Sequence, residues 1–127
     1  MPYRVFIVED HPVMREAYVS FLALEPDLEV CGAVGSVEEA LGMLDNMECD
    51  LVVTDYRLPG QTGVELVRRL HETRPGLPSL VISGHDGPAF AREAEAAGAA
   101  GFLSKRDLVD TLVPTILALL DGRRVAA

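Results

Sequence analysis

Five short apolar runs that recur at regular intervals constrain the fold of this 127-residue chain more than any other feature. Their starts lie roughly 20 to 28 residues apart, a spacing typical of strands that alternate with helices. Leu51–Val53 and Leu80–Ile82 are continuously apolar, as expected of parallel strands buried on both faces. The five predicted strands cover residues 3–8, 28–34, 50–55, 78–83 and 100–104.

The segments between these runs carry apolar residues at helical spacing. Pro12 and Ser36 stand where the first two helices should begin. The segment 88–97 has the weakest helical pattern, because Phe90 is its one large apolar residue. The glycines placed to end helices are Gly76, Gly98 and Gly122.

Together these patterns predict an α/β fold of (βα)5 order. It is a doubly wound, five-stranded parallel sheet with right-handed crossovers and helices on both faces. A single domain is expected over residues 1–122, and residues 123–127 are expected to form a tail or the start of a linker to a possible effector domain.

Composition excludes several classes of protein. The chain has 11 basic and 20 acidic side chains, a formal net charge of −9, which disfavours direct binding to nucleic acid. No apolar run is long enough to span a membrane, and the first residues do not resemble a signal peptide. We therefore expect a cytoplasmic protein without membrane contact, in which Cys31 and Cys49 are reduced.

Polar side chains stand where the predicted strands end. Glu9 and Asp10 follow the first strand, Asp55 ends the third, Ser83 ends the fourth and Lys105 follows the fifth. Ligands of an open parallel sheet bind at the carboxyl ends of its strands. The sequence therefore predicts that three carboxylates, a hydroxyl and an ammonium meet at one edge of the sheet.

Such a cluster requires a counter-charge. Two carboxylates 4 Å apart repel by about 4 kcal/mol at an effective dielectric of 20. Three of them would take up protons or bind a cation, and all-oxygen ligands favour Mg²⁺ or Mn²⁺. A cation, the Lys105 ammonium and the Ser83 hydroxyl would together suit a phosphoryl group. One carboxylate could then act as a nucleophile and form an acyl phosphate.

Four motifs in order resemble the receiver domain of two-component response regulators. They are IVEDH (7–11), VVTDYRLPGQTG (52–63), VISG (81–84) and GFLSK (101–105). The resemblance covers residues 3 to 122 and implies the flavodoxin-like receiver fold. The runs EDHPVMRE and SKRDL resemble the NarL/FixJ-like subgroup, whose receivers precede a helix-turn-helix DNA-binding domain.

The resemblance implies a role for each acidic residue. Asp55 would accept the phosphoryl group from a sensor histidine kinase. Asp10 would bind Mg²⁺ directly and Glu9 would bind it through water. Asp55 and the backbone carbonyl of Arg57 would complete the protein ligands. From its position at the mouth of the site, we also expect the Arg57 side chain to tune the lifetime of the acyl phosphate.

The resemblance also implies a switch. Lys105 would pair with a phosphoryl oxygen, and Ser83 would donate its hydroxyl to the same group and pull the 84–88 loop. Phe102 matches the switch aromatic, although it lacks the hydroxyl of a tyrosine. The output face would be the helix 88–97, the last strand and the last helix, which is also a possible homodimer surface. DNA would be contacted through an effector domain absent from this chain.

Other interpretations of these residues stay open at this point. Glu9, Asp10 and Asp55 could cap helices, Ser83 and Lys105 could be ordinary loop residues, and Phe102 could be core. His11 is expected to be structural at the start of the first helix. Leu117, Leu119 and Leu120 cover more than one face of the last helix, and Pro114 should bend it. That helix either packs more deeply into the core or presents a partner surface.

Three alternative functions also stay open. A haloacid dehalogenase-like Mg²⁺-dependent phosphohydrolase also forms an aspartyl phosphate, although its nucleophile belongs to a D-x-D motif after the first strand. A flavodoxin-like cofactor module would need a phosphate loop where this chain has EDHPVM. A receiver that interacts with partners but is never phosphorylated is the third. We expect a phospho-switch that catalyses its own phosphorylation and dephosphorylation, and no other enzyme activity.

Overall fold

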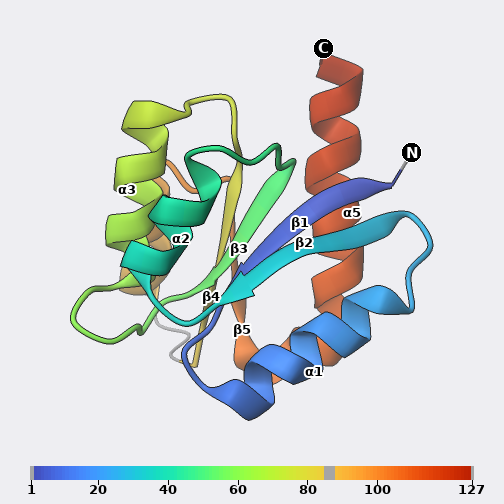
Figure 1. Ribbon diagram of the computed structural model, residues 1–127, viewed down its shortest axis with the longest axis horizontal. Coiled ribbons are helices and arrows are strands. Elements are labelled where there is room, and N and C mark those ends of the chain that lie inside the picture. The colour runs from blue at the N-terminus through green and yellow to red at the C-terminus, as the bar shows by residue number, and fades with distance from the viewer. Residues whose placement is uncertain (1, 85–87, 127) are drawn as a thin grey trace.

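The computed structural model describes residues 2–84 and 88–126, and it confirms the predicted alternation of strands and helices (Figure 1). The strands are β1 (Tyr3–Val8), β2 (Leu28–Val34), β3 (Leu51–Asp55), β4 (Ser79–Ser83) and β5 (Gly101–Ser104). The helices are α1 (Pro12–Ala23), α2 (Val37–Leu44), α3 (Gly63–Thr73), α4 (Pro88–Ala97) and α5 (Leu108–Ala126). A short 3₁₀ turn, Lys105–Asp107, joins β5 to α5.

The five strands form one parallel sheet in the order β2-β1-β3-β4-β5. The chain moves from β1 to one neighbour, β2, and then returns past β1 to β3 on the other side (Figure 1). This reversal places the switch point of the sheet between the carboxyl ends of β1 and β3, where Val8 pairs with Thr54. Ligands of doubly wound sheets bind at such a crevice.

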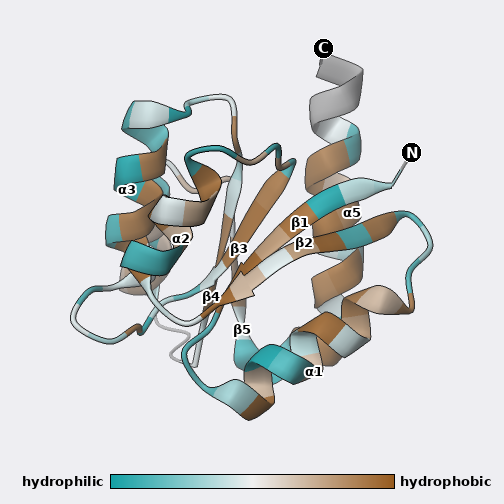
Figure 2. Cartoon of the chain, viewed as in Figure 1, coloured by the Kyte–Doolittle hydropathy of each residue, from teal (hydrophilic) through white to brown (hydrophobic). Residues whose placement is uncertain are grey.

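Helices cover both faces of the sheet, and the alternating side chains of each strand divide the core into layers. Val5 and Ile7 pack with α1 and α5, while Phe6 and Val8 pack with α2 and α3. Figure 2 shows the central strands as predominantly hydrophobic, with hydrophilic residues on the outer surfaces of the helices. None of the helices that the structure describes is both long and apolar enough to cross a bilayer.

Helix α5 differs from its prediction in one respect. Gly122 does not end the helix, which continues to Ala126. Gly122 is not among the glycines with positive φ, and a glycine inside a helix costs only about 1 kcal/mol relative to alanine. Gly98 does end its helix as predicted, with a φ of 111°.

The apolar residues on more than one face of α5 pack against the core of the domain. Leu120 is 1% exposed, and Leu117 and Leu119 are half-buried against the cluster that includes β1 and α1. A side chain at Gly101 of β5 would contact Leu119, so this leucine covers strand surface that has no side chain of its own. The helix surface thus favours the deeper-packed interpretation for Leu117 and Leu119.

Local capping fixes where the helices begin. His11 caps α1, where its Nδ1 accepts from the Met14 N–H at 3.5 Å and Pro12 follows directly, so its predicted structural role is confirmed. Ser36 Oγ accepts from the Glu39 N–H at 3.2 Å, as predicted for α2. Thr62 caps α3 in the same way. Because α1 and α3 follow the ends of β1 and β3, these caps also position the residues at the crevice.

Candidate functional site

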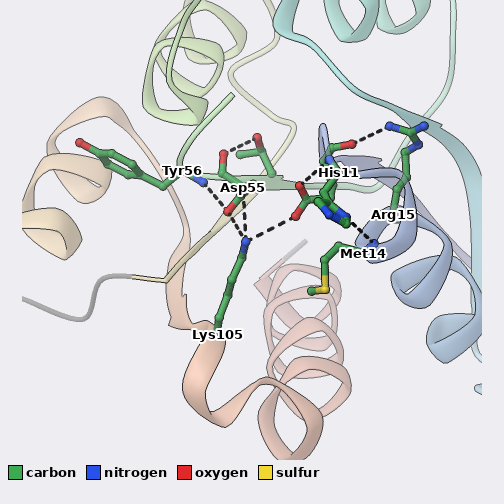
Figure 3. Close-up of polar contacts among 8 residues, drawn as sticks. His11, Met14, Arg15, Asp55, Tyr56 and Lys105 are labelled. Carbon is green, nitrogen blue, oxygen red and sulfur yellow. Dashed lines mark hydrogen bonds and ion pairs between the residues drawn. The ribbon is translucent and has the colours of Figure 1, made fainter. Parts of the chain in front are cut away.

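Glu9, Asp10, Asp55 and Lys105 meet at the carboxyl edge of the sheet, and Figure 3 shows Lys105 and Asp55 pointing toward each other. Glu9 and Asp10 lie directly after β1, and Asp55 is the last residue of β3. Lys105 follows β5, and its Nζ lies 3.2 Å from Asp55 Oδ1 and 3.5 Å from Glu9 Oε1. The structure therefore brings together four side chains that are up to 96 residues apart in the sequence, counting from Glu9 to Lys105.

The backbone around Asp55 is held by several hydrogen bonds. The Tyr56 N–H donates to Asp55 Oδ1 at 3.1 Å, and the Thr54 hydroxyl donates to the Asp55 carbonyl at 3.0 Å. Gly63, the first residue of α3, packs so closely that a Cβ there would lie 2.0 Å from the Asp55 carbonyl oxygen. The carboxylate therefore projects from a rigid strand end.

Glu9 is a buried carboxylate, 1% exposed. Its Oε2 accepts from the His11 N–H at 3.1 Å, and its carbonyl accepts from Arg15 Nη1 at 2.8 Å. Its Oε1 accepts no hydrogen bond from the described residues, although the Lys105 ammonium is near. Burial raises the pKa of Glu9 above its ordinary value of 4.5; the His11 N–H opposes this rise and the charge of Asp55 adds to it.

Asp55 is buried too, with 6% exposure. Burial raises its pKa above the ordinary value of 3.8, and the charge and hydrogen bond of Lys105 oppose that rise. Three carboxylates gather here, and the Lys105 ammonium lies within ion-pair distance of Asp55 and Glu9. A bound cation would add positive charge beside these carboxylates.

The geometry suits a small hard cation. Glu9, Asp10 and Asp55 each offer an oxygen, and these oxygens lie within 4.8 Å of one another. Two of the carboxylates are buried, whereas Asp10 is exposed at the rim. An all-oxygen donor set with a buried, unbonded Glu9 Oε1 fits the coordination preferences of Mg²⁺.

The acids and Lys105 line an open hollow of about 400 Å³, and His11, Arg57 and Pro59 contribute to its wall. The hollow is large enough for a phosphoryl group with its metal and water. A larger hollow of about 620 Å³ lies beside the ends of α2 and α3, but none of the predicted site residues lines it. The residues that line each cavity, and not its volume, therefore identify the smaller one as the candidate site.

Ser83 and Arg57 belong to the neighbouring strand end and turn. Ser83 is fully buried at the end of β4, where it pairs with Ser104. Arg57 is exposed and its backbone bridges to Thr62, so its carbonyl belongs to the turn that leads to α3. Residues 85–87 of the predicted 84–88 loop lie outside the described residues.

Phe102 is half-buried and packs against a cluster formed by α3, β4 and α4. Its side chain is therefore a core contact in this structure. Sequence reasoning missed Tyr56, which packs against the same cluster and contacts α4. Its place directly after Asp55 is visible in the sequence, but its contact with α4 is not.

Comparisons with known proteins identify the family of this chain. The family model for the response regulator receiver domain matches residues 5–116. The transcriptional regulatory protein UhpA of Salmonella typhimurium is 36% identical over 118 residues, which cover 93% of this chain and 59% of UhpA. The DNA-binding transcriptional activator DevR/DosR of Mycobacterium tuberculosis is 37% identical over 102 residues, covering 80% of this chain and 47% of the relative. The chain thus spans roughly half the length of these relatives.

Solved structures extend the comparison. A two-component response regulator of the LuxR family from Aurantimonas sp. SI85-9A1 superposes with a TM-score of 0.92 and 33% identity, covering 97% of this chain and 88% of that one. A CheY-like receiver domain from Methanospirillum hungatei JF-1, at 23% identity and a TM-score of 0.89, shares the fold.

These matches give no support to the haloacid dehalogenase-like alternative, whereas the predicted fold, family and subgroup are confirmed. This chain belongs to the response regulator receiver domains of two-component systems, and its relatives include LuxR- and NarL-type transcriptional regulators.

Proposed function

We propose that this domain accepts a phosphoryl group on Asp55 from the phosphohistidine of a sensor kinase. The observation that carries the proposal is the buried Asp55 carboxylate at a rigid strand end, facing an open hollow with Lys105 and two further acids. In the transfer, an Asp55 oxygen forms a bond to phosphorus while the phosphorus–nitrogen bond of the donor breaks. The imidazole leaves with the electron pair and takes up a proton.

Each neighbouring residue has a role in this proposal. Glu9, Asp10, Asp55 and the backbone carbonyl of Arg57 would hold Mg²⁺, with Mn²⁺ as a substitute. When bound, the ion supplies positive charge for the phosphoryl oxygens. Lys105 would move its ammonium from the Asp55 carboxylate to a phosphoryl oxygen.

Two further residues would respond once the phosphoryl group is attached. Ser83 would donate its hydroxyl to this group, and Phe102 would follow the resulting movement of the β4–α4 connection. The domain would then act as a switch that controls transcription through a DNA-binding domain outside this chain. Transfer to Asp55 and hydrolysis from it would be its own reactions.

Incubation with acetyl phosphate and Mg²⁺, followed by intact mass measurement, tests the acceptor. The expected result is a mass gain of one phosphoryl group that disappears in Asp55→Ala and after removal of Mg²⁺ by EDTA. Asp45→Ala is a matched control, because it removes an exposed carboxylate at the end of α2 and should leave the gain intact. A mass gain that persists in Asp55→Ala would refute Asp55 as the acceptor.

The exposed cation at the mouth of the hollow is a separate part of the proposal. The Arg57 side chain would shield the acyl phosphate from water, since it is exposed and lines the hollow above Asp55. Arg57→Ala should therefore change the rate at which the phosphoryl group is lost. An unchanged rate would remove this role for Arg57.

A homodimer through the α4 and α5 surface is the last part of the proposal. It is supported by the exposure of Val109 near the start of α5, at 75%. Sedimentation with and without beryllofluoride and Mg²⁺ should show a larger species when the phosphoryl analogue is bound. A chain that stays monomeric over a wide concentration range in both conditions would exclude this dimer.

A further inference from the structure

Tyr56 contacts both Asp55, through its backbone N–H, and helix α4, through its side chain. Its N–H donates to Asp55 Oδ1 at 3.1 Å and to the Ile82 carbonyl of β4 at 2.7 Å. Its own carbonyl accepts from the Gly63 N–H at 2.7 Å. These bonds hold the Tyr56 backbone at the end of β3, directly beside Asp55.

The Tyr56 side chain extends across the surface to α4. Its hydroxyl donates to Glu93 Oε1 at 2.5 Å, a short bond of the kind formed between a phenol and a carboxylate. Its ring meets Phe90 edge to face, with centroids 5.1 Å apart and an interplanar angle of 89°. One side chain therefore makes a polar and an aromatic contact to the same helix.

Helix α4 has few other large anchors. Its buried residues are Ala94 and Ala97, which are too small to bury much apolar surface. Phe102 of β5 packs against the same cluster but carries no hydroxyl. The phenol that forms a specific bond to α4 thus comes from the residue beside Asp55 and not from the last strand.

We propose that the Tyr56–Glu93 hydrogen bond is a latch that holds α4 in its resting position and thereby opposes activation at Asp55. This bond coexists with an unmodified Asp55 carboxylate that is paired with Lys105. A contact that stabilises this arrangement lowers the population of the alternative arrangement that a phosphoryl group on Asp55 would favour. Tyr56 is a positioning residue in this scheme, and the coupling rests on the proposed function of Asp55.

Hydrogen exchange of the α4 amides measures the latch without any phosphoryl chemistry. Tyr56→Phe keeps the ring and its contact with Phe90, and Glu93→Ala removes the acceptor. Each should speed exchange in residues 89–97 by about two- to tenfold, the range expected for one net hydrogen bond. The double variant should exchange no faster than the faster single variant, because both substitutions remove the same bond. Glu95→Ala, which removes an exposed carboxylate from the same helix, is the matched control and should leave the rate unchanged.

Binding of beryllofluoride with Mg²⁺ measures the coupling. Tyr56→Phe and Glu93→Ala should lower the apparent Kd by about two- to tenfold relative to the unsubstituted chain, and Glu95→Ala should not. The proposed latch is overturned if exchange is unchanged in both variants, or if exchange is faster but the apparent Kd is unchanged or higher. If the unsubstituted chain does not bind beryllofluoride at all, the proposed function of Asp55 fails and the coupling fails with it, while faster exchange would still identify the hydrogen bond as a structural tie.

Discussion

Helices α3 and α4 lie next to each other on the same side of the sheet, but they are attached in different ways. Helix α3 buries Val64, Leu66, Val67 and Leu70, and these side chains contribute to two separate core clusters. Helix α4 buries two alanines and adds the contacts of Tyr56. Buried apolar area sets most of the stability of a helix in a protein. Helix α3 is therefore a firm support for the turn after Asp55, whereas α4 depends more on the surface contacts of Tyr56 with Glu93 and Phe90.

The sharpest way to break this comparison is to remove a core side chain from each helix. Leu66→Ala removes a fully buried side chain of α3 and should lower the free energy of unfolding by about 2–5 kcal/mol. Ala94→Gly removes the methyl group buried by α4 and should cost about 1 kcal/mol. Urea unfolding measures both. Equal losses from the two variants would contradict the difference between the helices.

The close approach of α3 to β3 gives the next largest effect. Gly63→Ala would place a Cβ 2.0 Å from the Asp55 carbonyl oxygen and 2.8 Å from Thr54 Oγ1, so the helix must shift. We expect a loss of about 1–3 kcal/mol and slower phosphorylation by acetyl phosphate. Gly42→Ala, in open space within α2, is the control and should stabilise by about 0.5–1 kcal/mol. A Gly63→Ala variant as stable as the parent would show that the helix tolerates displacement.

The cap of α3 should matter less than its core. Thr62 Oγ1 accepts from the Glu65 N–H at 3.3 Å, and Thr62→Ala leaves this donor without its partner at the start of the helix. The expected loss is about 1 kcal/mol in urea unfolding, and Thr62→Ser should retain most of the stability because it keeps the hydroxyl. A loss as large as that of Leu66→Ala would mean that the cap, and not the core, anchors α3.

The smallest predicted effect is on pH dependence, and it concerns the acids that α3 supports. The pKa values of Glu9 and Asp55 are raised in the folded chain above their ordinary values of 4.5 and 3.8. The folded state therefore binds more protons than the unfolded state just above these values. Without Mg²⁺, this contribution to stability is present at low pH and is lost as the pH rises toward neutrality.

Urea unfolding as a function of pH checks this prediction. Compared with Asp55→Asn, the unsubstituted chain should gain more stability on acidification from pH 7, and Mg²⁺ at pH 7 should stabilise the unsubstituted chain more than the variant. Identical pH profiles for the two proteins would show that burial of Asp55 carries no penalty.

The sequence was informative wherever a residue type has one physical role at its position. Apolar runs located all five strands, and the polar residues after them located the site, because parallel strands bring their ends to one edge. Gly122 misled the prediction, since a glycine permits a helix end but does not impose one. Tyr56 was missed because its importance depends on α4 lying opposite, and an aromatic residue after a strand has no pattern of its own that indicates such a contact.

Lys105 occupies a junction whose consequence extends beyond the ion pair. It is the first residue of the 3₁₀ turn, which runs without interruption into α5, the 19-residue helix. The segment that carries the Lys105 ammonium is therefore also the start of α5, the longest helix among the described residues. A displacement of the Lys105 backbone would therefore act at the start of that helix, where a small change of angle moves the opposite end farthest.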